Sequence, residues 1–367
     1  MNLETHLNEL PETDACALRE IVRRLRGQPD AEPSGGLHDR VIAQLPTRRT
    51  STFSAWLWRS GAIAASLIAL LSIASVIRLW LPHERQTVAA TEDGIRWLAE
   101  NQETDGTWAP ARHGGIETFR PALTALSLLA LHQDAQSYAP QIAKGMSALA
   151  ELQTTKGTFG GDDSQAQLYN LAITTYVLAA CEADPTVVSR AVVSIGASQQ
   201  PDGSWTYAAA QEGSAAVTAW MTRALETAEA YGIAEANIPL RKGLRWLRGN
   251  VRDDGRMAYH PTSEPSETLT ALSAYALISA GNLFPDLQQL GIRMTNALHV
   301  QPAGVAPTDC YRDYAKIIAF ESAGKTANAE NVRNQIRQRH PTTAHDQWGV
   351  AGGQLYTAAL TTLCRAH

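Results

Sequence analysis

The sequence predicts an all-α protein in which about six helical hairpins close into a ring, preceded by one membrane-spanning helix and a short N-terminal tail. Three observations predict this fold class. A turn motif recurs along the chain, helical apolar periodicity flanks each turn, and an uncharged apolar stretch precedes the first repeat. Similar segments at a nearly fixed interval are typical of a repeat architecture.

The turn motif is clearest between Gln199 and Trp205, which reads Gln-Gln-Pro-Asp-Gly-Ser-Trp. Pro201 presets one backbone angle, Asp202 can bond the backbone ahead of it, and Gly203 accepts a positive φ. Trp205 adds a large apolar side chain that must be buried. We therefore predict a tight turn whose tryptophan packs between the helices on either side.

The motif recurs at intervals of roughly 45 to 50 residues, which lies in the range of known repeat arrays. The copy from Gln102 to Trp108 keeps Gln, Gly and Trp at the same offsets. Looser copies are Gln153 to Phe159, residues 253–257 with Met257 in the tryptophan position, residues 301–304 and residues 347–349. The repeat therefore extends through most of the chain.

The segments around the turns differ in polarity. An amphipathic run such as residues 243–247 precedes each turn, and a more uniformly apolar run rich in Ala and Thr, such as residues 269–273, follows it. A helix that is apolar on nearly every face is buried, whereas a striped helix lies outside. We expect pairs of one outer and one inner helix across residues 91–367. Closure is favoured over an open solenoid, since no polar capping repeat follows the last pair.

These Gln-x-x-x-Gly-x-Trp turns resemble the QW repeats of the terpenoid cyclase and protein prenyltransferase superfamily, whose fold is the α/α-toroid. The chain is most similar to the single-toroid prenyltransferase and squalene oxidase repeat proteins, over about three quarters of its length. The resemblance implies that the Gln and Trp tie outer helices to neighbouring turns. Because that role is structural, the motif indicates a fold rather than a reaction.

The stretch from residue 60 to residue 77 carries no charge and is mostly Ala, Ile and Leu. With its flanks, residues 55–81, it is long enough for a transmembrane helix. Tryptophans stand where the two membrane interfaces would lie: Trp56, Trp58 and Trp80. The alternative, a buried helix of the ring, is disfavoured because the repeat begins only after this stretch.

Arginines predict the orientation of this span. Three precede it and two follow it, namely Arg48, Arg49 and Arg59 against Arg78 and Arg85. The positive-inside rule then predicts a cytoplasmic N-terminus and an extracytoplasmic toroid. Residues 1–52 form the predicted cytoplasmic tail. This layout resembles membrane-anchored anti-sigma regulators, although their His-x-x-x-Cys-x-x-Cys signature is absent, so a plain tail is favoured over a transmembrane regulator.

Composition excludes several classes of protein. The net charge of −5 gives no basis for binding nucleic acid. The four cysteines show no Cys-x-x-Cys spacing, which predicts neither a disulfide framework nor a zinc site. In the prenyltransferase relatives an Asp, a Cys two residues later and a His bind zinc. Here Asp309 and Cys310 are adjacent and the last inner helix has no His, so we predict no metal and no cofactor.

Ligands of a toroid bind inside the inner barrel or at its mouth, because that is its one large concavity. Acidic residues stand at the predicted starts of the inner helices and should ring one mouth: Glu117, Asp162, Asp163, Glu212, Glu267 and Asp309. Capping of helix N-termini is the favoured interpretation of each. Basic residues on or near inner helices could bind a carboxylated sugar, as in a polysaccharide lyase. Of these, Arg223 and Lys316 are expected to snorkel or to pair with the acidic mouth.

Aromatic residues on the inner helices could line a hydrophobic pocket, although core packing is the favoured interpretation: Tyr169, Tyr176, Trp220, Tyr275, Tyr311 and Tyr314. As candidate ligand-binding residues we select Tyr169, Trp220 and Tyr311, together with Glu117, Glu212, Glu267 and Asp309.

Catalysis has one candidate pair, Asp162 and Asp163. Squalene–hopene-type cyclases use an Asp-x-Asp-Asp motif whose middle Asp protonates an alkene, and clustered carboxylates do raise one another's pKa. Here Gly replaces the leading Asp. We therefore predict a membrane-anchored, non-catalytic toroid that binds an isoprenoid, glycan or peptide or serves as a scaffold, with a terpenoid cyclase as the alternative.

Overall fold

The computed structural model describes residues 94–161, 164–206, 212–260, 263–282, 284–300, 309–337 and 349–365. Within these ranges the chain is helical, apart from turns and two isolated β-bridges. The predicted tail and span, residues 1–52 and 55–81, and the repeat copies at 301–304 and 347–349 lie outside the described residues, except Gly349. None of the described helices is both long and apolar enough to cross a bilayer.

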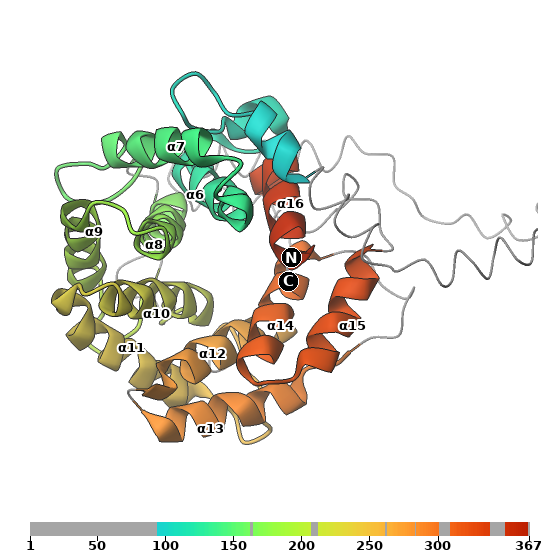
Figure 1. Ribbon diagram of the computed structural model, residues 1–367. Coiled ribbons are helices and arrows are strands. Elements are labelled where there is room, and N and C mark those ends of the chain that lie inside the picture. The colour runs from blue at the N-terminus through green and yellow to red at the C-terminus, as the bar shows by residue number, and fades with distance from the viewer. Residues whose placement is uncertain are drawn as a thin grey trace, which may run out of the picture. The chain divides into compact units, whose positions relative to one another are not determined.

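The helices alternate between an inner and an outer layer (Figure 1). The inner helices are α6 (Arg120–Leu131), α8 (Ser164–Ala180), α10 (Ala215–Ala230), α12 (Glu267–Ser279), α14 (Cys310–Ser322) and α16 (Gly349–Arg365). The outer helices are a helix over residues 94–100, then α7 (Ala139–Glu151), α9 (Pro185–Ala197), α11 (Asn237–Asn250), α13 (Pro285–Met294) and α15 (Thr326–Arg337).

Burial distinguishes the two layers as the polarity of the sequence predicts. Every residue of α6 from Pro121 to Leu131 is buried, whereas α7 buries only Gly145, Ala148 and Leu149. Short 3₁₀ helices complete the connections: η1 (Pro110–His113), η2 (Glu117–Phe119), η3 (His132–Asp134), η4 (Ala234–Ala236), η5 (Ala280–Asn282) and η6 (Thr295–Ala297).

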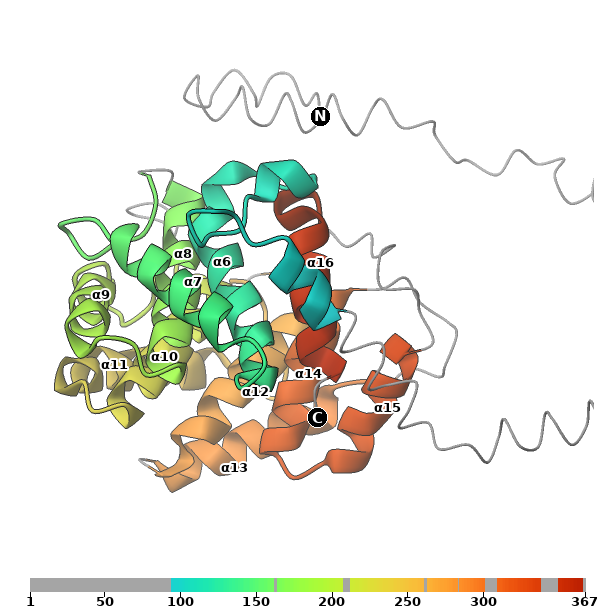
Figure 2. The same cartoon turned by 45° about the horizontal axis from the view of Figure 1, so that its top comes forward.

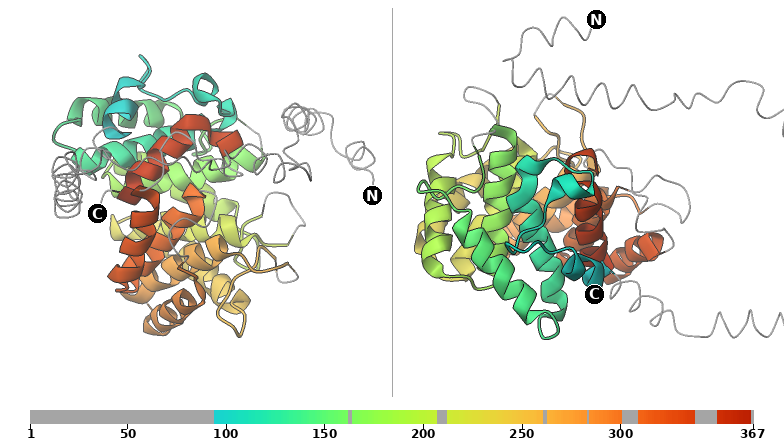
Figure 3. Two further views of the ribbon diagram at one scale, coloured as in Figure 1. Left: turned by 90° about the vertical axis from the view of Figure 1, so that its right-hand side faces the viewer. Right: turned by 90° about the horizontal axis from the view of Figure 1, so that it is seen from above.

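The ring of inner helices is closed. Each inner helix contacts the next along the chain from α6 to α16, and α16 in turn packs against α6. Figures 2 and 3 show α16, in dark red, beside the blue-green α6. Closure by hairpins of paired helices confirms the predicted ring and excludes the open solenoid for the described helices.

In three of the repeats, a glutamine joins the turn to the next outer helix. The Gln199 amide nitrogen donates to the Gly203 carbonyl at 2.9 Å and to the Pro239 carbonyl, in the first turn of α11, at 2.9 Å. The same two bonds recur at Gln102, to Gly106 and Gln141, and at Gln153, to Gly157 and Val187. The structural role that the resemblance implied for this glutamine is thus present.

The tryptophan of each turn lies between its own two helices. Trp205 is fully buried, its indole N–H donates to the Ile195 carbonyl of α9 at 2.9 Å, and its backbone N–H donates to the Thr218 hydroxyl of α10 at 3.1 Å. Trp108 makes the equivalent bonds. Met257 is also fully buried, and its backbone N–H donates to Thr270 of α12, which confirms the weaker copy.

The turn glycine is required by backbone geometry. Gly203 has a φ of +97°, which side-chain-bearing residues rarely adopt. A Cβ at this position would lie 2.6 Å from the Lys242 carbonyl oxygen of α11. The turn therefore fits against the following outer helix only with glycine, and the spacing of the hairpins around the ring depends on it.

A candidate ligand-binding pocket at one mouth of the ring

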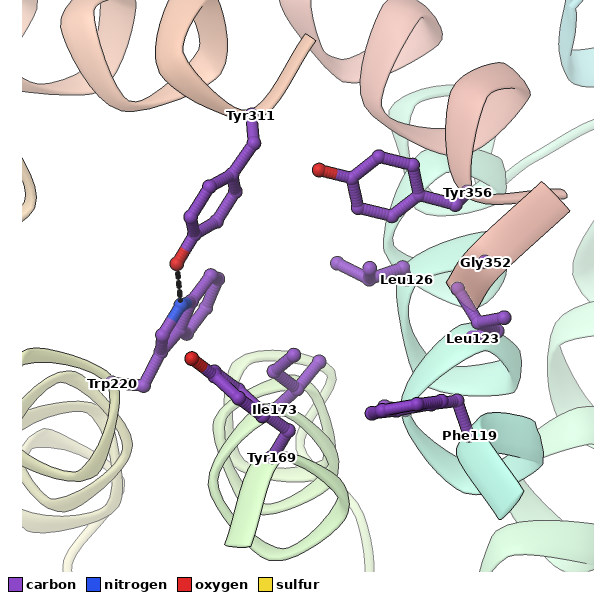
Figure 4. Close-up of a pocket in the computed structure, with 10 residues that line it drawn as sticks. Phe119, Leu123, Leu126, Tyr169, Ile173, Trp220, Tyr311, Gly352 and Tyr356 are labelled. Carbon is purple, nitrogen blue, oxygen red and sulfur yellow. Dashed lines mark hydrogen bonds between the residues drawn. The ribbon is translucent and has the colours of Figure 1, made fainter. Parts of the chain in front are cut away.

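A pocket opens where the N-terminal halves of the inner helices converge (Figure 4). Because every outer helix returns to an inner one, the inner helices run in the same direction and their first turns meet at one mouth. The lining residues come from η2, α6, α8, α10, α14 and α16: Phe119, Ala122, Leu123, Leu126, Tyr169, Ile173, Trp220, Tyr311, Gly352 and Tyr356. The cavity they enclose is about 60 Å³.

The three aromatic residues selected from sequence lie together on this pocket. The Trp220 indole N–H donates to the Tyr311 hydroxyl at 2.5 Å, and the two rings are nearly parallel with centroids 6.4 Å apart. Figure 4 shows this pair on one side of the pocket, with Tyr169 beside it. Burial raises the pKa of Tyr311 well above its ordinary value, so its hydroxyl is neutral. This hydrogen bond joins α10 to α14, the two inner helices on either side of α12.

The chemistry of the lining is carbon-rich. Aromatic rings and aliphatic side chains surround the space, and polar atoms enter it only as tyrosine hydroxyls and an indole N–H. Among the residues that the structure describes, no Asp, Glu, Lys or Arg lines the pocket. A surface of this kind favours an apolar ligand, since a charged or highly hydroxylated one would lose hydration without compensating hydrogen bonds.

Two acidic residues at the mouth have structural roles. The Asp309 carboxylate accepts from the Arg312 backbone N–H at 2.9 Å and caps α14, as the favoured interpretation of these acids predicted. Glu267 accepts from the Lys316 ammonium at 2.7 Å and from the His299 backbone N–H at 3.0 Å. Although burial opposes it, these bonds hold the pKa of Glu267 below its ordinary value. The expected pairing of Lys316 with the acidic mouth is thus observed.

Glu117 and Glu212 are not among the residues that line the pocket. Glu117 accepts from Arg120 and lies half exposed, and Glu212 is exposed just before α10. Asp162 and Asp163, the predicted catalytic pair, lie outside the described residues, so their role stays a prediction. Within the described ranges, no group of three His, Cys, Asp or Glu side chains could hold a metal ion.

Several lining residues were missed from sequence. Phe119 and Tyr356 stand at opposite ends of the toroid sequence, and Leu123, Leu126 and Ile173 look like ordinary core positions. Their placement distinguishes them: Phe119 directly precedes α6, and the others lie within the first ten residues of α6, α8 or α16. That signal was available from the repeat, because it predicts where each inner helix begins.

Comparison with known proteins identifies a similar fold but does not indicate an activity. The sequence matches no protein-family profile and no curated protein. The structure is similar to that of a family 76 glycoside hydrolase from a bovine Bacteroides thetaiotaomicron strain, with a TM-score of 0.56 and 11% sequence identity. The match covers 76% of this chain and 77% of that one.

At this identity the likeness concerns the fold alone. The described residues form an α/α-toroid with an aromatic pocket at one mouth. The comparison agrees with the toroid part of the predicted resemblance, and it does not single out the terpenoid cyclase and prenyltransferase branch. It is compatible with a ligand-binding or scaffold role.

Proposed function

We propose that the toroid is a non-catalytic binding domain for an apolar small molecule, which is held in the mouth pocket. The observation that carries the proposal is the lining itself, in which rings and aliphatic side chains from six elements converge without a charged group. Burial of apolar ligand surface contributes about 25 cal/mol per Å², so even a short chain seated here gains useful affinity.

Two features support binding over chemistry at this pocket. Glycoside hydrolysis generally uses a pair of carboxyl groups beside the scissile bond, and the described lining has none. A cavity of about 60 Å³ suits the end of an alkyl or prenyl chain and is far smaller than a thirty-carbon polyene. A polar glycan or an extended peptide would likewise find few hydrogen-bond partners in it.

The proposal is tested by blocking the pocket. The full chain is titrated with the fluorescent apolar probe N-phenyl-1-naphthylamine, and Ile173→Trp fills the cavity from α8. The matched control, Val193→Trp, adds similar volume on the outer helix α9, where the side chain is 57% exposed. We expect Ile173→Trp to weaken binding by about tenfold or more and Val193→Trp to leave it unchanged. Equal affinities of all three proteins would place the probe elsewhere and contradict the proposal.

We also propose that residues 55–81 anchor the toroid to a membrane, with residues 1–52 in the cytoplasm. The support is the uncharged apolar stretch and its flanking tryptophans. A bilayer is a local source of apolar molecules for the pocket. The full chain should stay with the membrane fraction after an alkaline carbonate wash, and deletion of residues 55–81 should release it. Release of the undeleted chain by the wash would contradict membrane anchoring.

A further inference from the structure

A buried arginine lies inside the ring, and it forms no ion pair with any residue that the structure describes. Arg223, on α10, is only 4% exposed. Its guanidinium carbon lies 4.0 Å from the ring centroid of Tyr176 and 4.6 Å from that of Tyr275, with Trp220 and Tyr314 slightly further away. One nitrogen, Nη2, donates to the Tyr176 hydroxyl at 2.6 Å, and the Tyr314 hydroxyl also hydrogen-bonds with the guanidinium. The guanidinium is thus enclosed by aromatic rings from four inner helices.

The hydrogen-bonding capacity of Arg223 is largely unused. Nε and Nη1 are buried and have no hydrogen-bond partner in the part of the chain that the structure describes. These two nitrogens carry three N–H groups. None of the ion pairs found within the described ranges includes Arg223. The sequence predicts that Arg223 snorkels or pairs with the acidic mouth; the side chain is buried, and no such pair is found within these ranges.

The surrounding groups do not neutralise this charge. Burial raises the pKa of Tyr176 and of Tyr314, so both hydroxyls are neutral. Glu226 lies one turn further along α10, and burial raises its pKa to about 7, which leaves it only partly ionised at neutral pH. The faces of the rings attract the cation, but they accept none of the three free N–H groups. A buried charge of this kind is stable only when paired, so the site calls for an anion.

Arg223 lies directly below the mouth pocket. On three inner helices a pocket residue is followed three positions later, one turn deeper, by a residue of the arginine cage: Ile173 and Tyr176 on α8, Trp220 and Arg223 on α10, and Tyr311 and Tyr314 on α14. The Trp220–Tyr311 hydrogen bond joins two residues at this boundary. An apolar layer and a cationic layer are therefore stacked along the lumen.

We propose that the ligand of the mouth pocket is an amphiphilic monocarboxylate, whose apolar chain occupies the pocket while its carboxylate accepts hydrogen bonds from the Arg223 guanidinium. This inference rests on the proposed function and names its ligand class. One guanidinium neutralises one negative charge, so a carboxylate fits better than a doubly charged phosphate monoester. Because Arg223 is not among the lining residues, binding in this mode requires that Trp220 and Tyr311 separate to admit the carboxylate.

The test compares two probes of equal chain length, octanoate and octan-1-ol, by calorimetric titration of the full chain at pH 6, where Glu226 is mostly neutral and octanoate is ionised. We expect octanoate to bind at least about tenfold more tightly than octanol, since only the carboxylate pairs with the guanidinium. Arg223→Met should remove this preference by weakening octanoate alone, and Arg223→Lys should keep part of it. The matched control, Arg241→Met, removes an arginine stacked over Phe284 on the outside of the ring and should change neither affinity.

The outcomes separate this inference from the proposed function. If the wild type binds octanol and octanoate equally well, the proposal that the ligand is a carboxylate is wrong. The proposal that the pocket binds an apolar molecule is then still supported. Binding of neither probe overturns both. If a folded Arg223→Met protein still prefers octanoate over octanol to the full extent, the carboxylate binds elsewhere and the proposed role of Arg223 is wrong. Because the wild-type comparison is decisive alone, the test does not depend on the stability of the variants.

Discussion

Replacement of Glu226 by Gln should make the protein more stable at alkaline pH. Glu226 lies on α10 one turn beyond Arg223, and burial raises the pKa of its carboxyl from the ordinary 4.5 to about 7. Arg223 lowers this pKa and Glu229 raises it, but burial has the larger effect. The folded protein therefore holds the Glu226 proton more tightly than the unfolded chain does.

The sign of the pH dependence follows from proton binding. Between pH 4.5 and about 7 the unfolded chain releases the proton while the folded protein retains it, so Glu226 lowers the free energy of unfolding as the pH rises through this window. Above about pH 7 the effect is constant. Each factor of ten in proton affinity is worth about 1.4 kcal/mol, so a pKa raised from 4.5 to about 7 gives a full effect of at most about 3 to 4 kcal/mol. Partial exposure of the side chain reduces it to about 1 to 3 kcal/mol.

Urea unfolding of the full chain at pH 5 and pH 8 measures this effect. The amide of Gln mimics the neutral acid, so Glu226→Gln should match the wild type within about 0.5 kcal/mol at pH 5 and exceed it by about 1 to 3 kcal/mol at pH 8. The control is Glu235→Gln on the exposed helix η4. A variant less stable than the wild type at pH 8 would refute the reasoning. It would show that ionised Glu226 neutralises Arg223, which would also remove the need for an external anion.

Three further variants test the architecture by chemical denaturation. Gly203→Ala should lower the free energy of unfolding by about 1 to 3 kcal/mol because of its positive φ and the nearby Lys242 carbonyl. Gly196→Ala, in the preceding outer helix with only an ordinary contact to Pro239, should be neutral or stabilise by up to about 1 kcal/mol; equal losses for both would contradict the geometry. Gln199→Leu should cost about 1 to 3 kcal/mol and speed hydrogen exchange in the first turn of α11, which an unchanged exchange rate would refute. Lys316→Met should cost about 3 to 5 kcal/mol by leaving Glu267 unpaired, and the further change Glu267→Gln should restore part of it.

The architecture could be predicted because the same turn residues recur with the same contacts in several repeats. Gly203 and Gly106 each meet a backbone carbonyl of the next outer helix, and Gln199 and Gln102 each bond the first turn of that helix. These contacts are formed between neighbouring hairpins, so short-range pattern and chemistry suffice to infer them. The substitution of Met257 for tryptophan did not obscure the pattern, because the buried position and the bond to Thr270 were kept.

The site could be predicted only in part, because it joins residues that are distant in the sequence. Trp220 and Tyr311 are 91 residues apart and meet because α10 and α14 pack on either side of α12. Their place on inner helices was inferable, but which rings face one another was not. Arg223 illustrates the same limit. Its position on an inner helix was known, whereas its partners depend on how α8, α12 and α14 pack around it.

The proposed pocket and ligand both depend on a closed ring of helices. A pair of engineered cysteines tests this closure directly. A Cβ at Gly94, on the first outer helix, would lie 3.6 Å from the Cβ of Thr362 on α16, within the range of disulfide bonds. After mild oxidation of the Gly94→Cys, Thr362→Cys protein, we predict a peptide that links residues 94 and 362 in the mass spectrum. The pair Gly94→Cys, Thr227→Cys, with its second position on α10, should give no such link. Absence of the 94–362 link, with both cysteines free in a folded protein, would contradict a closed toroid.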